Sequence, residues 1–316
     1  MTVTTTIRPP LIAIVGPTAV GKTATSLLLA REFPAEIINA DSRSFYRGMD
    51  IGTAKVTPEE RAQAPHHLVD ILEPDEPMSL ATFQDLAYTT IEAIHARRHL
   101  PLLVGGTPQY VNAVVEGWSI PRVAPNDQLR QELEREAERD GVAVLEDRLR
   151  AVDPVAAEKN AGNLRRIIRA LEVWEATGIP ITEQQTKVPP PYDMLELELY
   201  APREFIYDRI DRRVEQQIAD GLIDEVRGLL DRGIAPDVSA FGSIGYRQVL
   251  PHLDGEASVA EVAERIKLDS HRLVRHQQTW FRKNDRLVRI DVSRPDWEDD
   301  IRARVAAIAG PWLRAR

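Results

Sequence analysis

The feature that most constrains this chain is a strand-like segment followed directly by a glycine-rich loop and a helix-like segment, within residues 11–31. Residues 11–15 (LIAIV) are all apolar, as in a buried strand, and residues 23–31 place apolar side chains at helical spacing. The loop between them, GPTAVGKT at 16–23, fits the pattern GxxxxGK[ST] of a phosphate-binding loop. A strand, this loop and a helix in that order are typical of an α/β domain that binds a phosphorylated ligand.

The residue types within the loop suit an anion. Gly16 and Gly21 allow the backbone to wrap, so that successive amide hydrogens and the start of the helix point at a phosphate. Lys22 adds a positive charge, and the Thr23 hydroxyl is predicted to ligate Mg²⁺. We predict that a diphosphate or a nucleotide is bound by the whole loop: Gly16, Pro17, Thr18, Ala19, Val20, Gly21, Lys22 and Thr23.

Strand and helix patterns alternate along most of the chain, which predicts a parallel sheet with flanking helices. Further strands are expected at 36–40, 100–104, 195–200 and 286–292, and helices at 85–98, 203–220, 222–231 and 258–284. Ligands of parallel sheets gather at the carboxyl ends of the strands. Val15, Asp41 and Thr107 stand at or just beyond such ends, so we expect them to converge on one crevice.

Residues 121–191 differ from the rest of the chain in their sequence pattern. This stretch has charged helical patterns at 127–140, 142–151 and 164–177, another helix begun by Asp153 and Pro154, and no clear strand. The predicted fold class is therefore α/β, a P-loop NTPase-like parallel sheet with flanking helices and a helical insertion domain. Residues 1–120 and 192–316 are expected to form the catalytic core, and residues 121–191 the insertion.

The chemistry beside the loop is unusual for a nucleotide hydrolase. Such enzymes usually carry an acidic residue at the end of a neighbouring strand to hold the metal. Here the strand at 100–104 is followed by Gly105, Gly106 and Thr107, and the only acid that ends an early strand is Asp41. Asp41 is open to four interpretations: general base, substrate ligand, metal ligand or helix cap.

Composition limits the classes of function. The chain of 316 residues contains no cysteine, which excludes disulfides, thiolate nucleophiles, iron–sulfur clusters and cysteine-ligated zinc. Its net charge of -9 argues against nucleic-acid binding by bulk charge, so a polyanion must find a local basic face. Apolar runs are far shorter than a membrane helix, and MTVTTTIRPP at 1–10 lacks the pattern of an export signal. We expect a cytoplasmic protein without a membrane partner.

Six segments, read together, closely resemble the tRNA dimethylallyltransferases, the MiaA-type tRNA isopentenyltransferases. They are GPTAVGKT (16–23), DSRSFYRGMDIGTAK (41–55), APHHLVDI (64–71), LVGGTPQY (103–110), RRIIRALEVW (165–174) and GSIGYRQ (242–248). The resemblance implies transfer of a dimethylallyl group from dimethylallyl diphosphate to N6 of the adenine beside the anticodon, position 37. The substrates would be tRNAs that read codons starting with U, and the loop would hold the departing diphosphate rather than a nucleotide to be cleaved.

The resemblance also implies site residues, Mg²⁺ as cofactor and a monomer. Asp41 would accept a proton or hydrogen bond from N6, Thr107 would touch base and phosphate, and Arg247 would be a further cation on the diphosphate. The anticodon stem-loop of tRNA would be contacted by Asp41, Ser42, Arg43, Ser44, Thr107, Arg130, Arg165, Arg166, Ile167, Ile168 and Arg169. Many relatives have glutamine where Ser44 stands, which leaves the role of Ser44 open.

Two groups of residues have a plain structural interpretation beside a functional one. Residues 271–289 mix arginine and lysine with Trp280 and Phe281, a composition that suits an RNA backbone, although both aromatics are expected in the core. His66, His67 and His271 are expected to be polar or phosphate-facing residues rather than metal ligands, because no set of carboxylates or cysteines surrounds them.

Three rival functions stay open at this stage. A small-molecule kinase or an adenylate prenyltransferase would use the same loop, but a kinase usually needs the missing strand-end acid, and an adenylate prenyltransferase has little need of the insertion. A nucleotide-gated tRNA-binding module would show nucleotide-dependent affinity and would modify no adenine.

Overall fold

The structure, a computed structural model, describes residues 7–315 and divides into two compact units. One unit contains the chain up to Val115 together with the chain from Pro191 onward, and the other is Glu116–Pro190. We call them the catalytic unit and the helical unit. Positions 1–6, which belong to the amino-terminal segment examined above for an export signal, lie outside the described residues.

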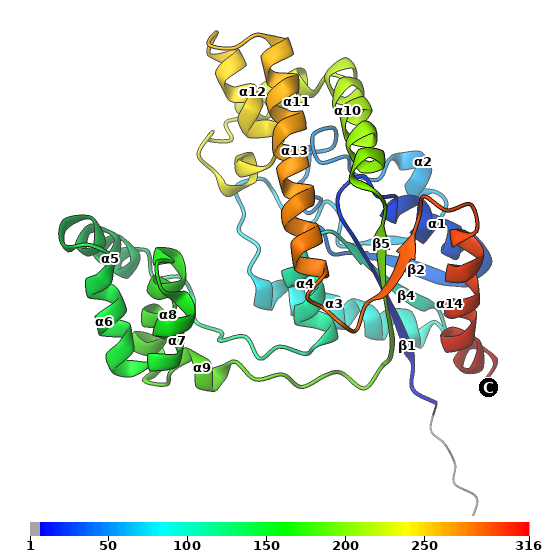
Figure 1. Ribbon diagram of the computed structural model, residues 1–316, viewed down its shortest axis with the longest axis horizontal. Helices are drawn as coiled ribbons and strands as arrows, with labels where there is room; N and C mark the ends of the chain where they lie inside the picture. Colours follow the sequence, from blue (N-terminus) through cyan, green and yellow to red (C-terminus); the bar gives the residue numbers. More distant parts are fainter. Residues whose placement is uncertain (1–6, 316) are drawn as a thin grey trace, which may run out of the picture. The chain divides into compact units, whose positions relative to one another are not determined.

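A six-stranded parallel sheet forms the centre of the catalytic unit (Figure 1), as the alternating patterns predict. The strand order is β3-β2-β4-β1-β5-β6, and every pair of neighbours is parallel. The strands are β1 (Pro10–Val15), β2 (Ala35–Asn39), β3 (His66–His67), β4 (Leu100–Gly105), β5 (Asp193–Tyr200) and β6 (Val288–Asp291). Only the two-residue β3 was not predicted.

Both faces of this sheet are covered, as the apolar strands require. In β1, Ile12 and Ile14 belong to one hydrophobic core, whereas Leu11, Ala13 and Val15 belong to the other. Since successive side chains of a strand point to opposite faces, a strand buried on both sides reads as a continuous apolar run.

The helices of the catalytic unit complete the two cores. The first core takes side chains from α1 (Lys22–Glu32), α10 (Arg203–Ala219), α11 (Leu222–Asp231), α12 (Tyr246–Leu253), α13 (Val259–Phe281) and α14 (Trp297–Arg314). The second takes them from α3 (Leu80–Ala96), α4 (Pro108–Val115) and Phe281 at the end of α13. Two short elements, α2 (Pro58–Arg61) and the 3₁₀ helix η1 (Ser239–Gly242), lie in the connections. In Figure 1 the long α13 runs beside α10.

Two eight-residue helices, α4 and α12, escaped the sequence analysis, as did the four-residue helices α2 and α9 (Ile181–Gln184). α4 starts at Pro108, directly after the GGT segment; proline is favoured at the first helical position, where no N–H donor is needed, and this signal was not used in the sequence analysis. α12 has Pro251 inside it, and an internal proline removes a hydrogen bond and normally argues against a helix.

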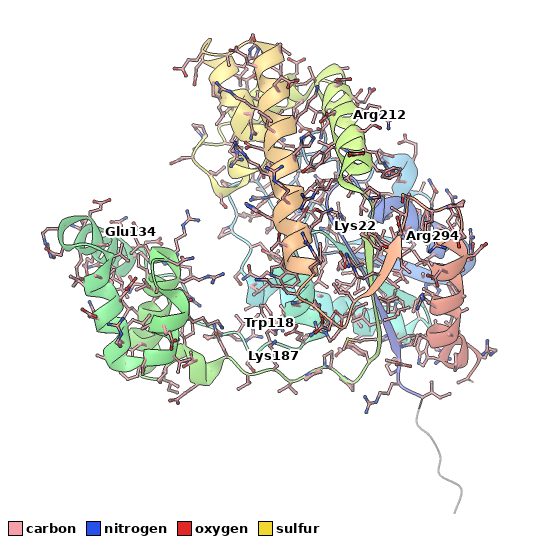
Figure 2. All side chains as sticks on the ribbon, viewed as in Figure 1. Lys22, Trp118, Glu134, Lys187, Arg212 and Arg294 are labelled. Carbon is pink, nitrogen blue, oxygen red and sulfur yellow. The ribbon has the colours of Figure 1, made fainter. Side chains whose placement is uncertain are left out.

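The helical unit has its own core and no strand among its described residues. It consists of α5 (Asp127–Asp140), α6 (Val142–Val152), α7 (Pro154–Asn160), α8 (Leu164–Thr177) and α9 (Ile181–Gln184). Its core includes Leu133, Leu145, Leu149 and Leu171. The chain enters and leaves this unit through two antiparallel segments bridged at Trp118 and Lys187, both labelled in Figure 2.

Within residues 7–315, no helix is both long enough and apolar enough to cross a membrane.

Candidate active site

The phosphate-binding loop connects β1 to α1 in a conformation that requires its glycines. Gly16 has a φ of 147°, and a Cβ there would overlap the carbonyl oxygen of Leu199. Gly21, with a φ of 112°, is the N-cap of α1 and supplies no side chain to the free amides of the first turn. These amides are therefore open to an anion.

The Lys22 side chain contacts the backbone of the phosphate-binding loop. Its Nζ donates to the carbonyl oxygens of Gly16 (3.0 Å) and Pro17 (2.9 Å), and it makes no ion pair within the described residues. Burial lowers the pKa of Lys22 to about 8; Asp41 opposes this shift and the cation of Arg213 adds to it. The ammonium group thus lies in a partly desolvated site where a phosphate would interact with it strongly.

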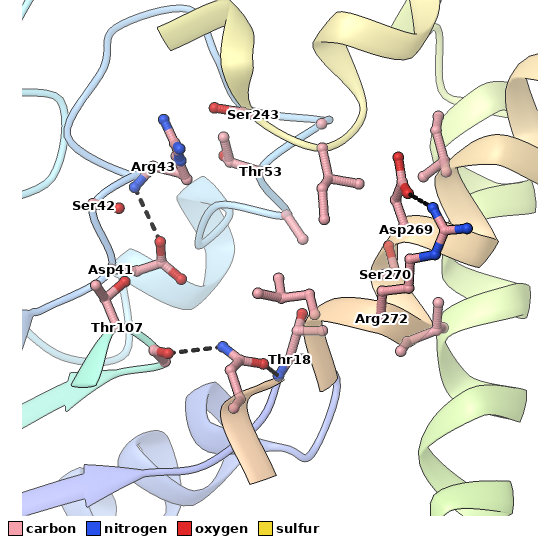
Figure 3. Close-up of a pocket in the computed structure, with 18 of the residues that line it drawn as sticks. Thr18, Asp41, Ser42, Arg43, Thr53, Thr107, Ser243, Asp269, Ser270 and Arg272 are labelled. Atoms are coloured by element: carbon pink, nitrogen blue, oxygen red, sulfur yellow. Dashed lines mark hydrogen bonds and ion pairs between the residues drawn. The ribbon is translucent and has the colours of Figure 1, made fainter. Parts of the chain in front are cut away.

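A cavity of about 640 Å³ opens beside the loop, and all of its lining residues belong to the catalytic unit (Figure 3). It is lined by Thr18 and Lys22 of the loop, by Asp41 after β2, and by Thr107 after β4. The predicted convergence of Asp41 and Thr107 is therefore confirmed, whereas the prediction for Val15 is wrong, because its side chain is only 2% exposed and belongs to a hydrophobic core instead of the cavity lining.

Asp41 is held with one carboxylate oxygen engaged and the other free. Its Oδ1 accepts the backbone N–H of Arg43 at 3.0 Å, and its Oδ2 makes no hydrogen bond within the described part of the chain. The residues that follow form turns, so the helix-cap interpretation is wrong. Asn39 fixes this backbone, because its side chain accepts from Asp41 N and donates to the carbonyl oxygens of Asp41 and Leu68.

A glutamine that the sequence analysis missed ties the loop to the GGT segment. Gln277 of α13 accepts the N–H of Thr18 at 3.0 Å and donates to the carbonyl oxygen of Gly106 at 2.7 Å. Thr18 is labelled in Figure 3. Thr107 follows Gly106, and its half-buried hydroxyl makes no hydrogen bond among the described residues. Gln277 therefore fixes the spacing between the anion site and the Thr107 hydroxyl.

Arg247 lines the same cavity from α12. Its guanidinium donates to Asp269 at 2.9 Å, and Asp269 also accepts from Gln248 and Arg272. Burial alone would raise the pKa of Asp269, but the hydrogen bonds from Gln248 and Arg247 reverse the shift and lower it. The Arg247 side chain stays 49% exposed, so part of it remains available to a ligand.

The remaining residues of the DSRS segment surround Asp41. Ser42 and Arg43 line the large cavity, and the Arg43 guanidinium also donates to the carbonyl oxygen of Ser239 at 3.3 Å. Ser44 lines a second cavity of about 280 Å³ that covers the phosphate-binding loop and α1.

The residues of this smaller cavity fit a magnesium ion. Thr23 lines it together with Asp41, and the Thr23 hydroxyl has no hydrogen bond within residues 7–315. A hydroxyl and a carboxylate are hard oxygen ligands, and Mg²⁺ commonly takes one or two protein ligands and completes its shell with phosphate and water. Within the same part of the chain, no three histidine or acidic side chains cluster around a metal position.

The three histidines have different surroundings. His66 lines the smaller cavity and its Nδ1 pairs with the Ala64 carbonyl oxygen. His67 lies 2.6 Å from a Glu36 oxygen, and His271 stacks on Tyr207 with ring centroids 3.9 Å apart. Whether any of them faces a phosphate stays a prediction.

In the helical unit, the arginines assigned to tRNA fall into two groups. Arg130 and Arg169 both donate to Glu172, whose side chain is 1% exposed. Arg165 and Arg166 are exposed, and their side chains make no hydrogen bond or ion pair within the described residues. Only the second pair has all of its donors available to RNA.

The predicted tRNA contact of two apolar residues in the same stretch is wrong. Ile167 and Ile168, at 0% and 4% exposure, lie in the core of the helical unit, so their side chains cannot contact RNA in this conformation. The helical spacing that places the arginines on the surface turns these isoleucines inward.

The two aromatic residues at the end of α13, Trp280 and Phe281, differ in exposure. Phe281 is 1% exposed and belongs to the second core, which confirms the expectation for this residue. Trp280 is 36% exposed and lines the large cavity, so its assignment to the core is wrong. Neighbouring residues of a helix point about 100° apart, and here one faces the sheet and the other the cavity.

Comparison with known proteins places this site in a family. The family model described as IPP transferase matches residues 44–284. A tRNA dimethylallyltransferase of Roseiflexus castenholzii is 54% identical over 288 residues, which are 91% of this chain and 94% of the relative.

Solved structures agree in fold. A tRNA isopentenylpyrophosphate transferase from Bacillus halodurans is 41% identical, with a TM-score of 0.71 and coverage of 96% of this chain and 98% of that one. A eukaryotic dimethylallyltransferase, solved acting on tRNA, is 25% identical, with a TM-score of 0.82 and coverage of 97% and 80%. The matched region and the identity over nearly the whole length show that this chain belongs to the IPP transferase family.

Proposed function

We propose that this protein transfers the dimethylallyl group of dimethylallyl diphosphate to N6 of the adenine next to the anticodon, position 37, in tRNAs that read codons starting with U. The observation that carries the proposal is that Lys22, Asp41, Thr107 and Arg247 open into one cavity. The site offers cations for a diphosphate and a free carboxylate oxygen for an amine, and β4 ends in glycine rather than in an acid.

The cations would act on the leaving group. As the allylic carbon–oxygen bond breaks, negative charge builds on the diphosphate, and donors fixed at that position stabilise the transition state. The free amides of α1, Lys22 and Arg247 are such donors. Magnesium held at Thr23 would act as a Lewis acid on the diphosphate oxygens.

Asp41 would act on the nucleophile. The lone pair of the adenine N6 is delocalised into the ring, so the amine is weak until its proton is accepted by a positioned base. The free Oδ2 of Asp41 can take that hydrogen bond and then the proton as the carbon–nitrogen bond forms. The unpartnered hydroxyl of Thr107 can orient the base or a phosphate oxygen.

The adenine has to leave its stack to enter such a cavity, as single-stranded loop bases do in sequence-specific RNA recognition. We propose that exposed arginines, Arg165 and Arg166 among them, bind the phosphates of the anticodon stem-loop. The protein would act as a monomer in the cytoplasm.

One assay tests the activity. The protein is incubated with labelled dimethylallyl diphosphate, Mg²⁺ and unmodified tRNA, and the digested RNA is examined for N6-dimethylallyladenosine. Parallel reactions replace the donor with ATP, or the tRNA with AMP. We expect label in tRNA only, with equimolar diphosphate released. Label in AMP would identify an adenylate prenyltransferase, and ATP cleavage without labelled RNA would identify a kinase or a nucleotide-gated module.

A further inference from the structure

A half-buried acid of α11, Glu225, was not found in the sequence analysis and makes no ion pair within residues 7–315. Its Oε2 accepts the backbone N–H of Asp50 at 2.8 Å and of Ile51 at 2.7 Å. Its Oε1 accepts the N–H of Gly52 at 3.1 Å and the hydroxyl of Tyr246 at 2.5 Å. Successive amides that point at one anion form a binding concavity, so four neutral donors satisfy this carboxylate.

The backbone that Glu225 holds is part of the wall of the large cavity. We call residues 50–54 the wall segment; their sequence, DIGTA, belongs to a motif whose role the proposed function leaves unexplained. Residues 52–54 line the large cavity together with Asp41, and Figure 3 labels Thr53 and Asp41 there. The position of the wall segment therefore sets the shape of the space beside Asp41.

Three helices hold the wall segment. Besides Glu225 of α11, Gln217 of α10 donates to two of its carbonyl oxygens, at 2.5 and 3.2 Å. From α12, the fully buried ring of Tyr246 packs so closely that a Cβ on Gly52 would lie 2.4 Å from it. The residue after Tyr246 is Arg247, which lines the cavity. Glu225 thus joins the wall segment to the start of the helix that carries Arg247.

We propose that Glu225 is a positioning residue of the transfer reaction: its carboxylate fixes the wall segment and the start of α12 to each other, and so sets where the cavity wall and Arg247 stand relative to Asp41. Glu225 lines neither cavity of the site, so it acts through these residues. A displacement of about 1 Å at reacting groups can slow a reaction by about 10²-fold. The inference rests on the proposed function for the identity of the reaction.

Glu225→Gln keeps the shape of the side chain and reverses part of its hydrogen bonding. Both carboxylate oxygens accept N–H groups, so in either orientation of the new amide its NH₂ faces a backbone donor. Tyr246→Phe is milder, because it removes one donor and leaves the carboxylate on its three amides. Glu36→Gln is the matched control: Glu36 also accepts several hydrogen bonds in the catalytic unit, but it lies at the other end of β2 from Asp41.

Single-turnover transfer separates positioning from loss of folded protein. With enzyme in excess over tRNA and saturating dimethylallyl diphosphate, the rate constant reports the chemistry of each intact site and does not depend on the fraction of active protein. For Glu225→Gln we expect this constant to fall at least about tenfold, and for Tyr246→Phe about threefold. Glu36→Gln should stay within about twofold of the parent, although thermal unfolding will show that it is less stable.

Hydrogen exchange measured by mass spectrometry reads the wall segment without substrate. For Glu225→Gln we expect exchange at least about tenfold faster in peptides that cover the wall segment and the start of α12, and parental exchange in β1 and α1. Glu36→Gln should leave the exchange of the wall segment unchanged.

A parental single-turnover rate for Glu225→Gln would overturn the proposal, and so would equal slowing by Glu36→Gln or unchanged exchange of the wall segment. If Glu225→Gln shows no cooperative unfolding, Tyr246→Phe decides: slower transfer supports the proposal and a parental rate overturns it. If the parent protein transfers no prenyl group, the proposed function fails, while hydrogen exchange still decides whether Glu225 holds the wall segment.

Discussion

Charged side chains are paired at one end of the central strands and unpaired at the other. At the amino-terminal edge, Glu36 of β2 is surrounded by His67, Arg97 and His99, all within hydrogen-bond distance. At the carboxyl-terminal edge, where the same strand ends, Asp41 accepts one backbone N–H and Arg213 has no partner in the described part of the chain. Charges satisfied within the protein are structural, and charges left unpaired in a cavity are available to a ligand.

The helical unit repeats this contrast around α8. Glu172 of α8 holds Arg130 and Arg169, whereas Arg165 and Arg166 on the same surface stretch stay unpaired. Arg165, Arg166 and Arg169 are the same residue type within one turn of α8. The partner, which is set by tertiary structure, decides which of them is free.

The largest expected effect sharpens the contrast between the two ends of β2. Asp41→Asn should lower kcat of transfer by about 10²- to 10⁴-fold, the usual contribution of a general base, and leave the unfolding temperature unchanged. Single-turnover transfer and thermal unfolding measure the two quantities. Pyrophosphate affinity serves as the control and should stay within about threefold, because the phosphate loop is intact. A variant that transfers at the parental rate would show that Asp41 is not the base.

Glu172→Gln tests the paired arginines of the helical unit. We expect a loss of about 3 kcal/mol in the free energy of unfolding, because two arginines lose the carboxylate that compensates them. The value stands at the low end of the usual range since those arginines are about a third exposed. Denaturant titration gives the value. Glu175→Gln on the same helix, which breaks an exposed pair with Arg148, should cost less than about 1 kcal/mol. Equal losses for the two variants would refute the distinction.

Acid sensitivity tests the paired edge of the sheet. Burial alone would raise the pKa of Glu36, but hydrogen bonds from Arg97, His67 and His99 lower it from 4.5 to about 2. Because the folded-state pKa is depressed, the stabilisation is complete above pH 4.5 and is lost as the pH falls toward 2.

Glu36→Gln should therefore be about 2 kcal/mol less stable than the parent at pH 7, and the difference should vanish near the folded-state pKa. Chemical denaturation across this pH range measures it. Glu73→Gln, which breaks an exposed pair with Arg47, is the control and should cost less than about 1 kcal/mol throughout. A difference for Glu36→Gln that stays constant with pH would exclude the carboxylate as its cause.

The smallest expected effect concerns the unpaired arginines of α8. Arg165→Gln and Arg166→Gln should each weaken tRNA binding a few-fold and reduce the slope of log affinity against log salt by about 0.7 to 1. Filter binding over a range of potassium chloride concentrations gives the slope. Stability should not change. If the slope stays at the parental value, these arginines are not phosphate contacts.

Local sequence patterns were sufficient for the parts of the fold that local physics determines. Continuous apolar runs identified the strands on which the site is built, and the loop pattern located Lys22 and Thr23. Because parallel strands end at one edge, Asp41 and Thr107 could be expected in the same crevice, and both line it.

The site residues that the sequence analysis missed can be found only when it is known which helices pack near the phosphate-binding loop. Gln277 and Arg213 lie on helices far along the chain, and no local pattern tells that α13 and α10 face the phosphate-binding loop. The same limit applies to Trp280 and Ile168, since helical spacing shows which residues share a face but not what that face meets. One weak signal could have pointed to Arg213: no acidic residue stands three or four positions from it in the sequence. The same signal also selects Arg165, so it does not identify residues of the cavity.

The central claim is that the unpaired charges around the phosphate-binding loop receive the diphosphate of a prenyl donor. A crystal structure with Mg²⁺ and a non-reactive thio analogue of dimethylallyl diphosphate tests this most directly. We expect diphosphate oxygens within hydrogen-bond distance of Lys22 and of the free amides at the start of α1, and the allylic carbon in the cavity lined by Asp41. A donor bound elsewhere, or a Lys22 side chain turned away from the bound diphosphate, would contradict the account.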